Sequence, residues 1–329
     1  MEKQKQRGEF DLIKELFVPL SKNSQGAFGL EDDACVILPD PGFELVVTSD
    51  AIVSGVHFRS DDPPDTIGRK LLRVNLSDLS AMGATPLGYI LAIVLSPEHR
   101  GDWLDSFASG LAQDQRTFAL TLLGGDTVST TGPSTFVVTA FGQARRGSVI
   151  CRSGAKVGDK VYVSGALGEG ALGLMVLRGE LPNLSDCDTK SLVNSYRIPK
   201  PRLALGKRLT HLASSAIDIS DGLLADLGHL AKCSGVGVDI QESLIPMSKE
   251  VQGLVSQIPS LAQLILSGGD DYELAFTAPP RNQEAIEAAA RDVGVPVSCI
   301  GTIVKTAGVR CLSRDGVNIS PDRTGFTHF

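Results

Sequence analysis

The stretch at residues 63–95 reads PPDTIGRKLLRVNLSDLSAMGATPLGYILAIVL and decides the predicted fold. Ile67, Leu71 and Leu79 recur at helical spacing, which predicts a helix over 63–82 with one apolar side. The apolar run at 87–95 that follows is typical of a buried strand. A helix placed directly before such a strand is the repeating element of an α/β fold.

The same alternation continues on both sides of this stretch. Further strands are predicted at 45–48, 120–123, 136–141, 160–164, 216–219, 236–240, 272–277 and 297–304. Helices are predicted around a core stripe of Trp103, Phe107 and Leu111, then up to Leu177, at 223–233 and at 283–293, with an exposed loop at 182–188. The turn-rich, basic stretch 143–158 predicts a boundary between an N-terminal α/β domain, 1–148, and a C-terminal α/β domain, 149–329.

The composition is that of a globular protein. The chain has 329 residues, 42% of them hydrophobic and 21% charged. Its net charge of −7 disfavours nucleic acid as a partner, since phosphate backbones bind basic faces. Residues 1–10 lack the apolar core of a secretory signal, and no apolar run approaches the ~20 residues that span a bilayer, so we expect a cytoplasmic protein without a membrane partner. The six cysteines are scattered, which predicts neither a zinc site nor a disulfide framework.

Aspartates gather at six points rich in Gly, Ser and Thr, most of them directly after apolar runs. They are Asp32, Asp33, Asp50, Asp78, Asp126, Asp218, Asp221, Asp270 and Asp271. Several ionised carboxylates in one cleft would repel each other unless cations neutralised them. Because Mg²⁺ prefers oxygen ligands and bridges to substrate phosphates, the pattern predicts a polymetal, polyphosphate site. The alternative is that each aspartate caps a turn or a helix, and that Asp78 with Asn75 forms an exposed polar face of its helix.

Three further features leave a choice between structure and function. Gly168, Gly170 and Gly173 match G-x-G-x-x-G after a predicted strand. Tight helix–strand packing explains this match best, phosphate contact comes second and a nicotinamide site third. A lone histidine such as His57 is more often a hydrogen-bonded structural residue. Arg152 has the planar fork that suits phosphate oxygens, but an arginine in a basic turn is usually solvated.

Motifs from one end of the chain to the other resemble those of the thiamine-monophosphate kinase family, in the ATP-binding superfamily that includes aminoimidazole ribonucleotide synthetase. They are GEF at 8–10, EDDA at 31–34, TSD at 48–50, HF at 57–58, VNLSDLSAMGATP at 74–86, GGDT at 124–127, RSG at 152–154, AIDISDGL at 216–223, SGGDDYEL at 267–274 and GFTHF at 325–329. The resemblance implies transfer of the ATP γ-phosphoryl group to thiamine monophosphate, the last step of thiamine diphosphate biosynthesis. It also implies a two-domain α/β fold like that of aminoimidazole ribonucleotide synthetase, in which the N-terminal domain forms a dimeric β-barrel-like core, and hence a homodimer.

The resemblance also implies roles for individual residues. It implies ligands for several Mg²⁺ ions at Asp33, Thr48, Ser49, Asp50, Asp78, Asp126, Asp218 and Asp221, ATP contacts at Gly125, Asp126, Arg152 and Ser220, and substrate contacts at His57, Asp270 and Phe326. No general base is implied, since the acceptor phosphate is already anionic and transfer depends on positioning and charge neutralisation. The family usually has glutamate in place of Asp270, one methylene longer. It often has threonine in place of Ser49, whose hydroxyl is retained here.

Three other functions are compatible with parts of the pattern. A sister ATP-dependent synthetase would act on a purine intermediate or on selenide, but a selenide enzyme needs a reactive cysteine in its N-terminal loop and residues 25–33 contain none. A nicotinamide oxidoreductase would bind NAD at the Gly168 motif without Mg²⁺. A non-enzymatic acidic metal-binding module would not turn over ATP.

Overall fold

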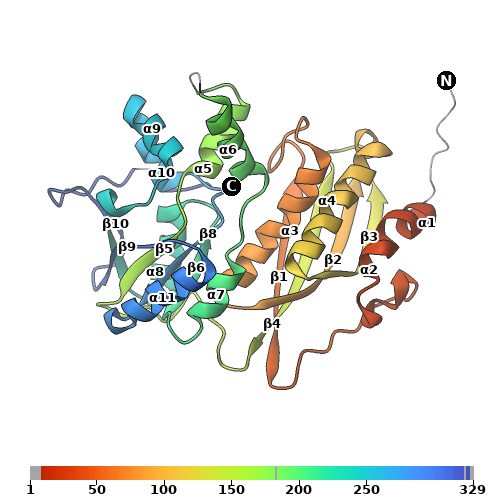
Figure 1. The fold of residues 1–329 in the computed structure, drawn as a ribbon, viewed down its shortest axis with the longest axis horizontal. Coiled ribbons are helices and arrows are strands. Elements are labelled where there is room, and N and C mark those ends of the chain that lie inside the picture. Colours follow the sequence, from red (N-terminus) through yellow and green to blue (C-terminus); the bar gives the residue numbers. More distant parts are fainter. Residues whose placement is uncertain (1–8, 182–183, 322–323, 327–329) are drawn as a thin grey trace. The chain divides into compact units, whose positions relative to one another are not determined.

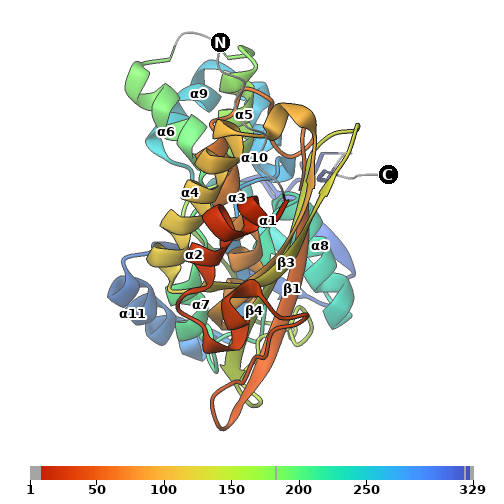
Figure 2. The same ribbon diagram turned by 90° about the vertical axis from the view of Figure 1, so that its right-hand side faces the viewer.

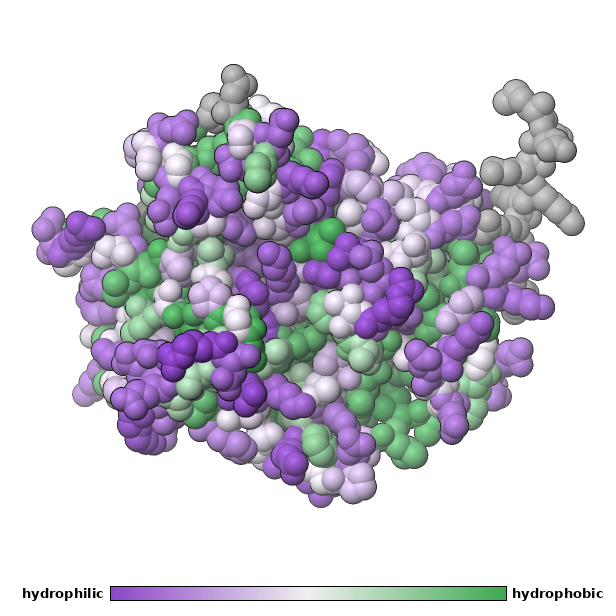
Figure 3. Space-filling view, in the orientation of Figure 1, coloured by the Kyte–Doolittle hydropathy of each residue, from purple (hydrophilic) through white to green (hydrophobic). Residues whose placement is uncertain are grey.

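The computed structural model describes residues 9–181, 184–321 and 324–326, so Gly8 and residues 327–329 of the quoted motifs lie outside the described residues. The chain divides into two compact units, residues 1–79 with 85–146 and residues 80–84 with 147–329. Each unit packs helices on a β-sheet (Figure 1). Figure 3 shows polar and apolar side chains mixed over one face, with apolar side chains gathered on the lower part of the first unit. Within the described ranges, no helix is both long and apolar enough to cross a membrane.

The first unit is built on a four-stranded sheet with the order β1-β4-β2-β3. Its strands are β1 (Phe43–Val53), β2 (Thr85–Leu95), β3 (Thr121–Ser129) and β4 (Thr135–Arg145). Strand β4 pairs antiparallel with β1 and β2, whereas β2 and β3 are parallel. A parallel pair needs a crossover connection, which helix α4 (Asp102–Phe118) provides. In the order β1-β4-β2-β3, strands β1 and β3 are the two edges of the sheet.

Helices α3 (Pro64–Ala81) and α4 cover one face of the sheet (Figures 1 and 2). The predicted apolar side of α3 is confirmed by Leu71, which is fully buried. On α4, Phe107 stacks on Phe136 of β4 with ring centroids 4.6 Å apart, and Trp103 stacks on Phe136 at 5.7 Å. These contacts confirm the core stripe predicted for α4.

The opposite face of β1 is open to solvent. Leu45 and Val47 are 41% and 53% exposed, whereas Val46 between them is 5% exposed. Successive side chains of a strand point to opposite faces, so this alternation arises when only one face is covered. Two large apolar side chains consequently stand on the uncovered side of an edge strand.

Short helices precede β1 and were not predicted. They are α1 (Glu9–Leu12), the π-helical η1 (Ile13–Phe17), α2 (Val18–Ser21) and the 3-10 helix η2 (Gln25–Leu30). Within η2, Phe28 and Leu30 have φ angles of 48° and 61°. Bulky residues rarely adopt this left-handed conformation, so the chain makes a sharp and unfavourable turn just before Asp32 and Asp33.

The second unit contains a six-stranded sheet with the order β10-β7-β9-β5-β8-β6. Its strands are β5 (Lys160–Ser164), β6 (Ser215–Ile219), β7 (Gly237–Gln241), β8 (Glu273–Ala278), β9 (Val297–Val304) and β10 (Gly308–Leu312). Val161 and Val163 of β5 belong to one apolar core, and Tyr162 between them belongs to another. The sheet therefore has a core on each face, as strand alternation requires.

Helices supply the other half of each core. One core contains residues of α5 (Glu169–Leu177), α6 (Asp186–Arg197), α8 (Leu223–Ser234), α9 (Lys249–Gln257) and α10 (Ala262–Ser267). The other contains residues of α7 (Leu203–Leu209) and α11 (Gln283–Val293). Because both faces are covered, every residue of the inner strand β8 is buried.

Most predicted elements are confirmed, and those at 160–164, 283–293 and 297–304 have the predicted bounds. The prediction of a loop at 182–188 is wrong from Asp186 onward, because helix α6 begins there and Ser185 Oγ caps it by accepting the Asp188 N–H. Residues 182 and 183 lie outside the described ranges. Asp50 and Asp126, predicted to follow strands, lie inside β1 and β3, since both strands continue past their apolar runs.

Candidate active site

Strand β1 and helix α3 bring residues predicted as metal ligands together in the first unit. Thr48 Oγ1 donates to Asp78 Oδ2 at 2.5 Å. The backbone N–H of Asp50 donates to Asn75 Oδ1 at 3.1 Å. Asn75 is fully buried, so the alternative of an exposed polar face on α3 is wrong. Side chains predicted from two separate motifs therefore lie side by side on the covered face of the sheet.

Ser49 lies between Thr48 and Asp50 but faces the other way. Its hydroxyl donates to the Val138 carbonyl at 3.0 Å and lies 3.1 Å from Thr139 Oγ1. This arrangement follows from the alternation of side chains along a strand. The three consecutive residues predicted as ligands thus divide between the two faces of the sheet.

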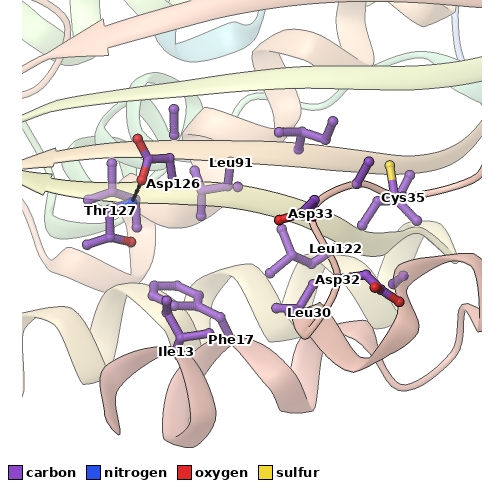
Figure 4. A pocket seen from close by; sticks show the side chains of 18 residues that line it. Ile13, Phe17, Leu30, Asp32, Asp33, Cys35, Leu91, Leu122, Asp126 and Thr127 are labelled. Carbon is purple, nitrogen blue, oxygen red and sulfur yellow. Dashed lines mark hydrogen bonds between the residues drawn. The ribbon is translucent and has the colours of Figure 1, made fainter. Parts of the chain in front are cut away.

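A cavity of about 570 Å³ lies between the N-terminal helices and strands β2 and β3. Figure 4 shows Asp33 and Asp126 on its wall, with Ile13 and Phe17 on the helical side. The cavity is therefore lined by apolar side chains and by carboxylates that the sequence predicted as metal ligands.

The part of strand β3 that lines this cavity includes residues without a side chain. Gly125 lines it, and a Cβ atom added there would overlap the Leu91 carbonyl of β2. Only glycine allows the two backbones to approach so closely. The next residue, Asp126, is exposed, and its Oδ1 accepts the Thr127 N–H at 2.8 Å.

Asp50 and Asp126 stand at opposite edges of the sheet. The strand register places Asp50 beside Val138, Val138 beside Leu91, and Leu91 beside Gly125. Three strand spacings of ~4.8 Å separate the ends of this row by roughly 14 Å. Since a Mg²⁺–oxygen bond measures ~2.1 Å, one ion cannot contact both carboxylates within a single copy of the chain.

His57 lies in a tight turn that follows β1. The Val53 N–H donates to His57 Nδ1 at 3.1 Å, and the His57 N–H donates to the Val53 carbonyl at 2.9 Å. Because Nδ1 accepts a hydrogen bond, the proton of the neutral ring is on Nε2. From α3, the buried Lys70 donates through Nζ to the His57 carbonyl at 3.2 Å. Both the strand and the helix therefore hold the turn.

In the second unit, three segments that are distant in sequence meet beyond the end of β6. The carbonyl oxygens of Ile219, Ser220 and Asp221 accept from the N–H groups of Tyr272 at 2.8 Å, Asp270 at 2.9 Å and Phe326 at 3.0 Å, respectively. Four predicted site residues are thereby brought together. Asp218 precedes them within β6 and is only 4% exposed.

Asp226 was not predicted, although it organises the same loop. Its Oδ2 accepts the backbone N–H groups of Ser220, Asp221 and Gly222 at 3.0, 3.1 and 3.2 Å. Burial and the nearby charge of Asp221 raise the pKa of Asp226 to about 7, against the lowering effect of the three N–H groups. Asp221, Asp226 and His229 each offer a ligand atom, and these atoms lie within 4.8 Å of one another. The available signal was an acid in the first turn of a predicted helix.

Backbone N–H groups of the glycine motif at 168–173 already donate to a side chain of the same unit. Asp271 accepts the N–H groups of Gly168 and Gly170 at 2.8 and 3.2 Å, at the N-terminus of α5. A dinucleotide fold would place a phosphate on these groups. Cβ atoms added at Gly170 and Gly173 would overlap backbone carbonyl oxygens of the neighbouring segments. The motif therefore serves close packing, the interpretation that the sequence analysis ranks first. Its N–H groups donate to Asp271 in the place where a nicotinamide cofactor would bind its phosphate.

Arg152 lies at the opposite end of β6 from Ser220. The Cys151 carbonyl accepts the Ala216 N–H at 3.1 Å, and the Arg152 carbonyl accepts from Ser234 Oγ at 3.1 Å. Ala216 and Ser220 are four residues apart along an extended segment, which spans roughly 13 Å. The backbone of Arg152 is therefore not brought beside Ser220, although both residues were predicted to contact ATP.

Comparison with known proteins gives matches along the whole chain. The family models described as AIR synthase related protein, N-terminal domain and C-terminal domain, match residues 31–144 and 156–312. Thiamine-monophosphate kinase of Caulobacter vibrioides is 42% identical over 97% of this chain and 90% of its own length. The Escherichia coli K12 enzyme of the same name is 39% identical over 98% of both chains.

Solved structures of similar chains share the fold. Thiamine-monophosphate kinase from Stenotrophomonas maltophilia K279a has a TM-score of 0.84 and 38% identity, with 94% of this chain and 98% of that chain covered. AaThiL complexed with AMPPCP and TMP has a TM-score of 0.77 and 28% identity, with 99% of this chain and 100% of that chain covered.

Proposed function

Because the chain belongs to the AIR synthase related protein family, among its thiamine-monophosphate kinases, we propose that it transfers the γ-phosphoryl group of ATP to thiamine monophosphate. The product is thiamine diphosphate. The observation that carries the proposal is the group of oxygen ligands on β1 and α3, where Thr48 and Asp50 meet Asp78 and Asn75. The AaThiL complex with AMPPCP and TMP supports the same pair of substrates.

Transfer between two phosphates requires charge neutralisation more than proton transfer. The attacking oxygen belongs to a phosphate that is already anionic, so the reaction needs positioning of the two substrates and no general base. The tautomer of His57 fits this requirement, because its Nε2–H can donate to an anionic oxygen while Nδ1 is engaged with the Val53 N–H. His57 therefore acts as a hydrogen-bond donor to the acceptor and not as a base.

The acidic residues fit Mg²⁺. Carboxylate and hydroxyl oxygens are the donors that this ion prefers, and Thr48, Asp50 and Asp78 offer only oxygens. Bound Mg²⁺ would offset the negative charge of the substrate phosphates. The Thr48 hydroxyl holds Asp78 in place by donating to its carboxylate. As the resemblance implies, we assign ligands for several Mg²⁺ ions to Asp33, Thr48, Ser49, Asp50, Asp78, Asp126, Asp218 and Asp221, with Ser49 on the opposite face of β1 from Thr48 and Asp50.

A homodimer accounts for the separation of Asp50 from Asp126. Both residues lie on edge strands, so the β3 edge of a second copy can approach the β1 edge of the first. The exposed side chains of Leu45 and Val47 supply apolar surface for such an association. We propose that each metal site takes Asp50 from one copy and Asp126 from its partner, around a two-fold axis.

The remaining assignments are those that the resemblance to thiamine-monophosphate kinases implies. Gly125 and Asp126 are assigned to the nucleotide, at the part of β3 that lines the cavity. Nucleotide contacts are likewise assigned to Ser220 and to Arg152, whose planar guanidinium matches phosphate oxygens. His57 and Asp270 contact thiamine monophosphate. Phe326, which is 45% exposed, offers its ring for stacking on a heteroaromatic ring of the same substrate.

A direct assay tests the proposed function. Purified protein with ATP, Mg²⁺ and thiamine monophosphate should form thiamine diphosphate, and thiamine should not replace the monophosphate because it lacks the acceptor phosphate. Asp50→Asn should abolish the reaction, whereas Asp102→Asn, a matched change of an exposed acid on α4, should leave it unchanged. Failure of the folded wild-type protein to form thiamine diphosphate would refute the proposal.

A further inference from the structure

The loop between α10 and β8 turns two neighbouring carboxylates in opposite directions. Asp271 binds the first amides of α5, as described above. Asp270 instead accepts a hydrogen bond from the phenolic hydroxyl of Tyr272, at 3.0 Å between Oδ1 and the hydroxyl oxygen. Asp270 and Tyr272 therefore lie on one side of the loop and Asp271 on the other.

The backbone of this loop is held in a conformation that its residues rarely adopt. Asp270 and Tyr272 have φ angles of 70° and 50°, both in the left-handed region. Their N–H groups donate to the carbonyl oxygens of Ser220 and Ile219 at 2.9 and 2.8 Å, which fixes the loop against the end of β6. Left-handed backbone at a bulky residue such as Tyr272 persists only where surrounding contacts impose it, and such positions cluster at ligand-binding sites.

We propose that Tyr272 is a positioning residue that orients the Asp270 carboxylate for the acceptor substrate. This inference rests on the proposed function, in which Asp270 contacts thiamine monophosphate. The thiamine part of that substrate carries a cationic ring and an amino group, and a carboxylate recognises both. A hydrogen bond from the Tyr272 hydroxyl to Oδ1 restrains rotation of the carboxylate, so that Asp270 meets the substrate in one orientation.

Removal of the hydroxyl alone tests this role. Tyr272→Phe should raise KM for thiamine monophosphate roughly tenfold, as expected for the loss of one hydrogen bond to a charged group, and should leave KM for ATP unchanged. Tyr162→Phe is the matched control, because the Tyr162 hydroxyl is buried in the same unit and makes no hydrogen bond within the part of the chain that the structure describes. This control should change neither KM.

A double-mutant cycle separates positioning from general support of the fold. Asp270→Asn keeps the shape of the side chain and is tolerated at positive φ, but it removes the charge that recognises the substrate. In that background, Tyr272→Phe should change KM for thiamine monophosphate by less than about twofold, since no charge remains to be oriented. Additive effects of the two substitutions, or an equal rise in KM for ATP, would overturn the inference.

Failure of this inference and failure of the proposed function give different results. If the wild-type protein forms no thiamine diphosphate, the proposed function is wrong. If it is active and Tyr272→Phe behaves like Tyr162→Phe, the function stands and only the positioning role is refuted.

Discussion

Two inactive variants should restore activity to each other if the carboxylates of one metal site come from different copies. The row from Asp50 to Gly125 crosses three strand spacings, roughly 14 Å, whereas two oxygens on opposite sides of one Mg²⁺ lie ~4.2 Å apart. Asp50→Asn and Asp126→Asn should therefore each be inactive alone. In a mixed dimer, one site carries both substitutions and the other retains both native aspartates.

The expected recovery follows from counting sites. With free exchange of subunits in an equal mixture, about half of the two-fold dimers are mixed and each has one native site, so about a quarter of the wild-type activity returns. A mixed dimer isolated through two different affinity tags should have about half of the wild-type activity per dimer. The assay is the formation of thiamine diphosphate from ATP and thiamine monophosphate.

The same experiment can refute the reasoning. A verified mixed dimer without activity would mean that both carboxylates serve a site within one copy, or that they serve different sites. Substantial activity of either variant by itself would remove that residue from the metal ligands. Two differently tagged preparations of Asp126→Asn, mixed in the same way, provide the control and should stay inactive.

Four further results are expected. Asp114→Ala should lower the free energy of unfolding by about 3–5 kcal/mol in urea denaturation, because it removes the buried carboxylate that pairs with Arg69 and Arg73. Burial raises the pKa of Asp271 from 3.8 to about 8, so between these pH values the folded protein keeps a proton that the unfolded chain releases. The free energy of unfolding should therefore fall as the pH rises through this range, and it should fall less in Asp271→Asn. Chelation of divalent ions should stop thiamine diphosphate formation and added Mg²⁺ should restore it, and a rate that survives chelation would count against the metal-assisted mechanism. His57→Ala should raise KM for thiamine monophosphate more than KM for ATP, and equal changes would argue against contact with the acceptor.

Local patterns predicted those elements whose apolar residues recur regularly. Helix α11 and strand β9 are of this kind, and both have the predicted bounds. Helix α6 was missed because only Leu192 and Tyr196, one turn apart, are buried among its polar residues. Packing against α5 stabilises this helix more than its own sequence pattern does. Such contacts between helices cannot be read from a single sequence.

The residue types of the candidate site can be read from the sequence, but their arrangement cannot. The acids of β1 and β3 were predicted as oxygen ligands from residue type and neighbouring small residues. Their positions on opposite edges depend on the strand order β1-β4-β2-β3, which is set by packing and not by local sequence. For Asp226 the sequence offers only an acid in the first turn of a predicted helix, which does not reveal that its partners are the backbone N–H groups of residues 220–222.

Helix α3 holds two parts of the proposed site along a single axis. Lys70 binds the turn that carries His57, and Asp78, eight residues later, receives the hydroxyl of Thr48. At a rise of 1.5 Å per residue, these attachment points are ~12 Å apart. A shift of the helix along its axis would move its contact with the His57 carbonyl and its contact with the Thr48 hydroxyl through the same distance. The spacing between the His57 turn, which we propose for the acceptor, and Asp78, which we propose for a metal ion, is thus set by eight residues of one helix.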